Sequence, residues 1–173
     1  TAADDDMLKL DLARQVARRH GARRGGVMIL RLLREAQFPF VRARAAESLS
    51  LHPSDEVTKA FVHALGDSDK DVLQAVLKAL LCVRDPRASD AAVRLIGHDD
   101  LDVREAATQL AGYYPDRHVA ALLAALQDKR SCKVRSAAAE GLARTAGPDA
   151  RIVPAILRAF EKERVNAYPD ALA

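Results

Sequence analysis

The sequence has no tryptophan, and aromatic side chains make up only 4% of its 173 residues. Sheet proteins depend on aromatic and β-branched residues to cover their pleated surfaces, so this scarcity argues against an all-β fold. The apolar residues, 49% of the chain, are mostly Ala, Leu and Val, a mixture that suits closely packed helices. We therefore expect an all-α protein.

Cysteine and long apolar runs are scarce as well. Cys82 and Cys132 have no third or fourth cysteine beside them, which excludes a disulfide framework or a four-cysteine zinc site. Cys82 is expected to be a small buried side chain at the end of a helix. No apolar run reaches the ~18 residues of a membrane span, and no signal peptide is seen. We expect a cytoplasmic bacterial protein and, because residue 1 is Thr, a domain of a larger protein.

Residues with the spacing of a catalytic or metal site are missing too. No His-x-x-x-His or His-Glu-x-x-His spacing occurs, and no phosphate-binding loop or nucleophile elbow is present. The acidic runs at residues 4–6 and 99–100 are interpreted as helix caps and solvated tails. We therefore assign no catalytic, cofactor-binding or metal-binding residue and expect a protein that is not an enzyme.

The sequence does contain an internal repeat. Val41, Val72, Val103 and Val134 recur every 31 residues and begin similar segments, such as "VREAATQLAG" at Val103. A small residue usually follows each valine four positions later, and Leu follows it eight positions later. This spacing places the valine, the small residue and the leucine on one face of a helix. Alanine at the middle of this stripe would let helices of adjacent repeats approach closely.

A second helix follows in each repeat, with apolar residues at i, i+3, i+4, i+7 and i+8, as in Val57 to Leu65 and Ile152 to Phe160. Proline stands near the start of each second helix, where its missing N–H costs little. These prolines are Pro53, Pro86, Pro115 and Pro148. Each repeat is therefore predicted to be a helical hairpin.

The amino-terminal segment is interpreted as a divergent repeat. Leu8, Leu12 and Val16 have the spacing of a first-helix core stripe, "HGARRGG" is expected to form a turn, and "VMILRLLREAQ" to form the second helix. We predict one continuous array without a domain boundary. Its repeats are about 7–40, 41–71, 72–102, 103–133 and 134–164, with a partial repeat at 165–173.

The pattern D-x-x-V-R-x-x-A-A-x-x-L, followed by a D-P-R-A-like turn and an apolar second helix, resembles the HEAT repeat. The short period is similar to the variant associated with phycobilisome bilin lyases. The resemblance implies an α-solenoid, a right-handed superhelix of about five hairpins. It also implies a structural role for Arg42, Arg104 and Arg135, and for Arg42 we expect a pair with Asp71.

Two basic features are candidate binding sites. The first is a cluster with no acidic residue within it, although Asp4, Asp5, Asp6 and Asp11 lie close enough to neutralise much of its charge: Arg14, Arg18, Arg19, Arg23 and Arg24. The second is a column formed by one position of each second helix, two residues before the last core residue of that helix. The residues at this position are Arg31, His63, Arg94 and Arg158, with Ala124 in the fourth copy. The resemblance would place this column on the concave face. Three functions stay open: a scaffold for a protein with an acidic surface, a nucleic-acid-binding module, and a bilin lyase or its partner subunit.

Overall fold

The computed structural model describes residues 2–20, 22–145, 147 and 149–167. Over these residues it contains α-helices and one 3₁₀ turn and no strand, which confirms the expected all-α fold. The elements are α1 (Ala2–His20), α2 (Ala22–Glu35), α3 (Pro39–Ser50), α4 (Asp55–Ala64), α5 (Lys70–Val83), α6 (Pro86–Ala92), η1 (Val93–Leu95), α7 (Leu101–Ala111), α8 (Pro115–Ala125), α9 (Cys132–Ala143) and α10 (Ile152–Ala167).

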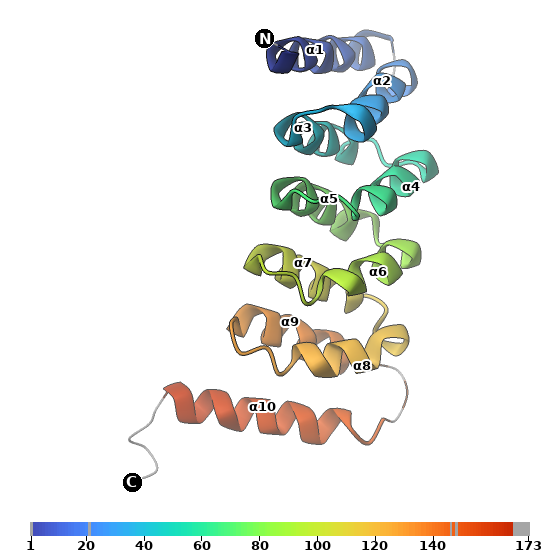
Figure 1. Ribbon diagram of the computed structural model, residues 1–173. Coiled ribbons are helices and arrows are strands. Elements are labelled where there is room, and N and C mark those ends of the chain that lie inside the picture. Colours follow the sequence, from blue (N-terminus) through green and yellow to red (C-terminus); the bar gives the residue numbers. More distant parts are fainter. Residues whose placement is uncertain (1, 21, 146, 148, 168–173) are drawn as a thin grey trace. The chain divides into compact units, whose positions relative to one another are not determined.

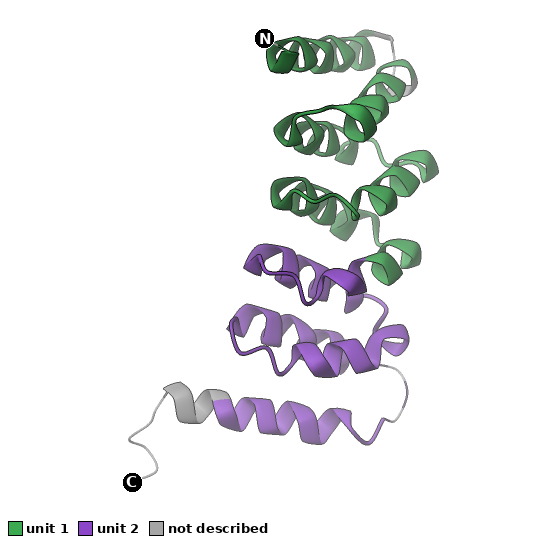
Figure 2. Ribbon diagram, in the orientation of Figure 1, with its two compact units in different colours: residues 1–91 green, residues 92–173 purple. Residues whose placement is uncertain are grey.

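The helices form two compact units, Thr1–Ala91 and Ala92–Ala173 (Figure 2). In unit 1, α1, α3 and α5 form one layer and α2 and α4 the other (Figure 1). In unit 2, α7 and α9 lie in one layer, α8 packs beside them, and α10 packs on α9. Each unit is a stack of helical hairpins, while the single continuous array and its right-handed superhelix remain predictions.

Short polar residues begin several of the helices at the predicted repeat boundaries. Asp69 and Asp100 accept hydrogen bonds from the backbone N–H groups of the first turns of α5 and α7, and Ser54 and Ser131 do the same for α4 and α9. A side-chain oxygen at this position satisfies an N–H that has no partner inside the helix. These caps fix where each helix starts.

Small residues line the buried stripe of the first helices, as the repeat pattern predicts. Ala45, Ala107 and Ala138 have no exposed surface. The valines that begin the stripe, Val41, Val103 and Val134, are also fully buried. Because no solvent reaches these alanines, there is no space for a larger side chain at these positions.

We expect Ala107→Leu to destabilise the protein by about 1–3 kcal/mol, because the added carbons must displace packed neighbours. The measurement is the free energy of unfolding in urea. Ala120→Leu is the matched control, since Ala120 is an exposed residue of α8, and it should change stability by less than about 0.5 kcal/mol. Equal stability of the two variants would contradict the buried position of Ala107.

The predicted register of the first repeat is wrong. Leu8 and Leu12 are 58% and 48% exposed, and the buried residues of α1 are Leu10 and Ala13. The expected turn at "HGARRGG" is also wrong, because α2 begins at Ala22 and contains both glycines. Gly25 permits this helix: a Cβ there would lie 2.4 Å from the Ala13 carbonyl oxygen of α1, so the two helices touch at this residue.

Two other expected core residues are exposed. Phe160 of α10 is 69% exposed, because no described helix covers its side of α10. Cys82 is exposed near the end of α5, contrary to expectation, and Cys132 is exposed at the first position of α9. Pro148 and residues 168–173 of the predicted partial repeat lie outside the described residues.

Candidate functional site

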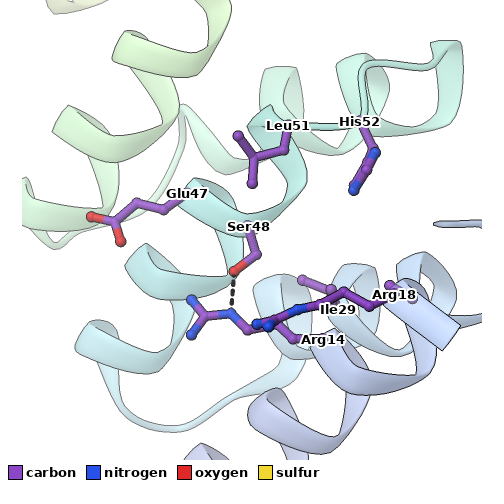
Figure 3. Close-up of a pocket in the computed structure, with 8 residues that line it drawn as sticks. Arg14, Arg18, Ile29, Glu47, Ser48, Leu51 and His52 are labelled. Atoms are coloured by element: carbon purple, nitrogen blue, oxygen red, sulfur yellow. Dashed lines mark hydrogen bonds between the residues drawn. The ribbon is translucent and has the colours of Figure 1, made fainter.

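A cleft opens in unit 1 between the α1–α2 hairpin and the segment that includes the end of α3 and the start of α4. It consists of two adjoining cavities of about 380 Å³ and about 560 Å³, which share Ala17, Ile29, Ser48 and His52. Arg14 and Arg18 of α1 lie on one side, and Glu47, Leu51 and His52 lie opposite (Figure 3). Cavities of this size are within the range of ligand-binding pockets.

Small residues on α1 and α2 create the space. Ala17 lines both cavities and Gly26 lines the larger one. A Cβ added at Gly26 would meet no heavy atom within 4 Å, whereas one at the neighbouring Gly25 would collide with α1. The two consecutive glycines therefore have different roles: Gly25 lets the helices touch, and Gly26 leaves the cleft open.

The floor and rim of the cleft differ in polarity. Apolar side chains from Ile29, Leu30 and Val57 form the floor, and Leu51 and Val27, 76% and 61% exposed, stand at its edges. Exposed large apolar side chains beside a cavity are typical of contact surfaces. The cleft can therefore accept an apolar side chain of a ligand.

The two arginines of the rim have different bonding. The Arg14 Nε donates to Ser48 Oγ at 2.7 Å, and its Nη2 donates to the Arg44 carbonyl oxygen at 3.3 Å, so Arg14 holds α1 against α3. The exposed Arg18 and His52 side chains have no recorded hydrogen bond or ion pair with any described residue. These two side chains are available to a ligand.

The predicted basic cluster is therefore not a single surface. Arg14 is a structural residue, Arg18 lines the cleft, and Arg19 and Arg24 are exposed outside its lining. The Arg23 side chain lies outside the described residues. Only part of the cluster can contribute charge to one ligand in the cleft.

The predicted column of basic residues divides between the units. Arg31 and His63 are exposed in unit 1, and Arg94 and Arg158 are exposed in unit 2, as is Ala124. The Arg31 Nε donates to Glu35 Oε2 at 2.7 Å, and this hydrogen bond raises the pKa of Arg31. The exposure agrees with the register that was predicted, but a single binding column remains a prediction.

A second polar feature connects the turns that flank first helices. The Arg42 guanidinium donates twice to Asp67, at 2.7 and 2.9 Å, and also to the carbonyl oxygens of Ala36 and Gln37. It thus joins the turn before α3 to the turn after α4. The predicted Arg42–Asp71 pair is wrong, because the carboxylate that Arg42 binds is that of Asp67. Asp71 lies four residues further on, in the first turn of α5.

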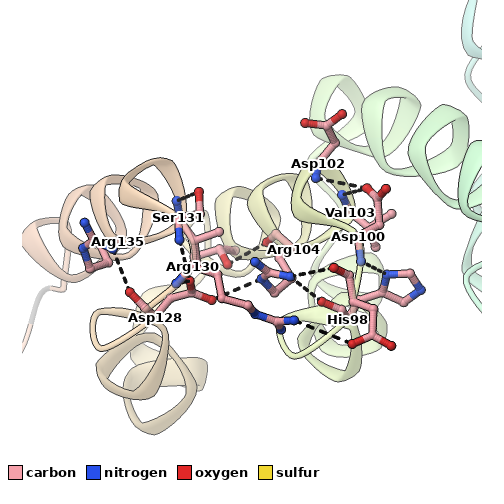
Figure 4. A network of polar contacts seen from close by, with 12 residues as sticks. His98, Asp100, Asp102, Val103, Arg104, Asp128, Arg130, Ser131 and Arg135 are labelled. Carbon is pink, nitrogen blue, oxygen red and sulfur yellow. Dashed lines mark hydrogen bonds and ion pairs between the residues drawn. The ribbon is translucent and has the colours of Figure 1, made fainter.

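The same arrangement occurs in unit 2 around Arg104 (Figure 4). Its Nε donates to Asp128 Oδ2 at 3.1 Å, and its Nη1 donates to the carbonyl oxygens of His98 and Asp99 at 2.7 and 3.0 Å. Arg135 donates to the Asp128 carbonyl oxygen. The Arg104 side chain is fully buried, so the expected structural role of this arginine agrees with its contacts.

The carboxylates of these turns are held in their charged form. Burial raises the pKa of Asp67, but hydrogen bonds from Arg42 and from the Asp69 backbone outweigh it, so the pKa lies below its usual value. Burial also raises the pKa of Asp128, and the N–H groups of Arg130 and Ser131 together with the Arg104 charge lower it below the usual value. Opposite charge and hydrogen bonding both favour the ionised carboxylate.

The described residues contain no group of three or more His, Cys, Asp or Glu side chains that could hold a metal ion. Every helix of that same part of the chain falls short of the length and apolar content that a membrane crossing requires. The cleft is thus the clearest candidate site.

The stacked hairpins define an α-solenoid, a class in which each repeat contacts its neighbours. Within this class, residues 28–112 match the family model for HEAT repeats, so the chain contains HEAT repeats. The resemblance seen in the sequence is confirmed, while the bilin-lyase subtype remains a prediction.

Several solved structures are similar to this chain. One of them, the crystal structure of an engineered protein from a structural genomics consortium, has 21% identity and a TM-score of 0.58 over 97% of this chain and 85% of that one. At this identity the likeness concerns the fold alone. No curated protein matches the chain significantly.

The cleft was not predicted from the sequence. Its residues come from α1, α2, the end of α3 and the start of α4, and none of these segments has a motif that indicates a cleft. The signal that could have indicated it is "LSLHPSDE", where Leu51 and His52 follow the last core residue Leu49 and precede a proline. An apolar residue in that position is expected to be exposed.

Proposed function

We propose that this protein is a non-enzymatic scaffold that binds another protein by accepting a short acidic segment in the cleft of unit 1. The observation that carries the proposal is the cleft itself, with an apolar floor and two side chains, Arg18 and His52, that have no recorded partner among the described residues. HEAT-type arrays present extended binding surfaces, which agrees with such a role.

The chemistry of the rim favours a carboxylate next to an apolar side chain. The Arg18 guanidinium matches the geometry of a carboxylate and can bind it through two N–H groups. The apolar neighbour would enter between Ile29 and Leu51. Glu47 and Glu56, on the same lining, would disfavour a uniformly acidic ligand such as a polynucleotide.

We expect that Gly26→Leu closes the cleft without harming the fold, because nothing lies near its Cβ and Leu favours helix more than Gly. Peptides selected by phage display on the wild type should contain an acidic residue beside an apolar one. Their dissociation constant should rise at least tenfold, about 1.4 kcal/mol, with Gly26→Leu and with Arg18→Glu.

Lys129→Glu is the matched control, an exposed charge reversal in unit 2, and it should bind the peptides as the wild type does. Unchanged affinity of a folded Gly26→Leu variant would refute the cleft as the binding site. Selection of basic peptides would refute the acidic partner. Binding of single-stranded DNA that competes with the peptide and disappears by ~0.2 M salt would favour the nucleic-acid function instead.

The exposed basic residues of the second helices give a separate prediction. We expect the triple change of Arg31, Arg94 and Arg158 to Glu to leave the unfolding temperature within a few degrees, because all three side chains are exposed and exposed ion pairs contribute about 0–1 kcal/mol. Association with an acidic protein partner should slow by about tenfold at low salt. Equal association rates in stopped-flow measurements would show that these residues are ordinary solvated surface.

A further inference from the structure

The two cavities of the cleft differ in the charged side chains that line them. The smaller cavity is bordered by Arg14, Arg18 and Glu47 (Figure 3). In the larger cavity, Glu56 is the only Asp, Glu, Lys or Arg side chain among the described residues of the lining. The His52 side chain lines both cavities. Arginine is therefore found at one end of the cleft only.

Ion pairs within unit 1 leave one charge of each sign without a partner in the cleft. The Glu47 carboxylate lies 3.8 Å from the Arg44 guanidinium, and Arg14 is bonded to α3. Arg18 in the smaller cavity and Glu56 in the larger one are exposed, and neither has a recorded hydrogen bond or ion pair with any described residue. A ligand therefore meets an unpaired positive charge at one end and an unpaired negative charge at the other.

The apolar part of the cleft lies between these two charges. Ile29 lines both cavities and so marks their junction. Val27, Leu30 and Val57 line the larger cavity, whose volume is about 560 Å³. An apolar side chain that enters between Ile29 and Leu51 can therefore extend into the larger cavity. Once seated, it separates the end that holds the unpaired arginine from the end that holds the unpaired glutamate.

We propose, on the basis of the function proposed for this cleft, that the bound segment of the partner protein has three side chains in the order acidic, apolar, basic. The carboxylate of the segment binds Arg18, whose guanidinium can donate two N–H groups to it. The basic side chain donates to the Glu56 carboxylate, which can only accept hydrogen bonds. The reverse orientation would place like charges together at both ends, and such contacts disfavour binding. The cleft thus selects the direction in which the segment lies.

The test uses peptides selected by phage display on the wild type, synthesised with acetylated and amidated ends so that terminal charges do not contribute. A Lys or Arg should recur on the far side of the apolar residue from the acidic one. By titration calorimetry at low salt, Glu56→Lys should bind such a peptide about tenfold more weakly, because attraction becomes repulsion. A salt concentration of about 1 M should reduce this difference, since the group is exposed.

A charge swap separates this contact from a general loss of binding. Replacing the basic residue of the peptide by Glu should weaken its binding to the wild type and restore its binding to Glu56→Lys. Glu56→Gln keeps the shape of the side chain at an exposed position, so it should fold as the wild type does and bind the two peptides equally. Glu140→Lys is the matched control, a charge reversal at an exposed glutamate of α9 in unit 2, and it should bind as the wild type does.

Selected peptides without a recurrent basic residue would overturn the proposed order of charges, and so would wild-type affinity of Glu56→Lys for a peptide that has one. If Gly26→Leu still abolishes binding in either case, the cleft remains the binding site and only the order of charges is wrong. If a folded Gly26→Leu variant binds the peptides as the wild type does, both the cleft and the order of charges are refuted.

Discussion

Replacing Gly25 by alanine is expected to destabilise the protein by about 3–5 kcal/mol, the range of severe core changes. The added Cβ would lie 2.4 Å from the Ala13 carbonyl oxygen, 2.5 Å from the Ala17 Cβ and 2.6 Å from the Ala17 N. Backbone atoms of α1 cannot rotate aside, so α1 must separate from α2. That separation would expose Leu10 and Ala13, which are fully buried. Urea unfolding measures the effect.

The neighbouring Gly26→Ala is the control. It adds the same methyl group to the same helix in open space, and the higher helix propensity of Ala should stabilise the protein by about 0.5–1 kcal/mol. The two variants should therefore differ in sign. A Gly25→Ala variant as stable as the wild type would mean that α1 and α2 do not touch at this residue.

Replacing Arg104 by alanine is the other change with a large expected effect, a loss of about 3–5 kcal/mol. The fully buried guanidinium is the donor to Asp128 and to the carbonyl oxygens of His98 and Asp99. Its removal leaves these acceptors without that partner and opens a cavity the size of the side chain. Both consequences destabilise the folded state.

Arg130→Ala provides the comparison. Arg130 lies in the turn next to Asp128 and pairs with Asp99 at 3.7 Å, but its side chain is 54% exposed. Its loss should cost about 0–1 kcal/mol. Similar free energies of unfolding for the two variants would show that the buried contacts of Arg104 stabilise the protein no more than the exposed Arg130–Asp99 pair does.

Much of the fold could be predicted because the repeat constrains it. The period of 31 residues located the first helices at Val41, Val72, Val103 and Val134, and each of these valines is fully buried. Prediction failed where no neighbouring repeat imposed a register. The α1 stripe was assigned to Leu8 and Leu12, although α1 uses Leu10 and Ala13 to contact α2. Either pair fits a helical period, and only the position of the partner helix α2 determines which pair is buried.

The polar contacts show the same limit. The structural role of Arg42 followed from the resemblance, but its partner is Asp67 and not Asp71. Asp67, Asp69 and Asp71 lie within five residues, and composition alone does not distinguish an ion-pair acceptor from a helix cap. Gly25 and Gly26 likewise read as a turn signal, although both lie within α2. Their roles depend on how closely α1 approaches each of them, and the sequence of α2 alone does not determine this.

The arginine contacts also bear on how the chain acquires its structure. Arg42 and Asp67 are 25 residues apart, and Arg104 and Asp128 are 24 apart. Proteins whose contacts join nearby segments fold faster than those that must close long loops. During synthesis, each arginine can meet its carboxylate as soon as its own repeat is complete, without waiting for a distant part of the chain. Folding of each unit should therefore proceed hairpin by hairpin from the ribosome, and its rate should depend little on how many repeats follow.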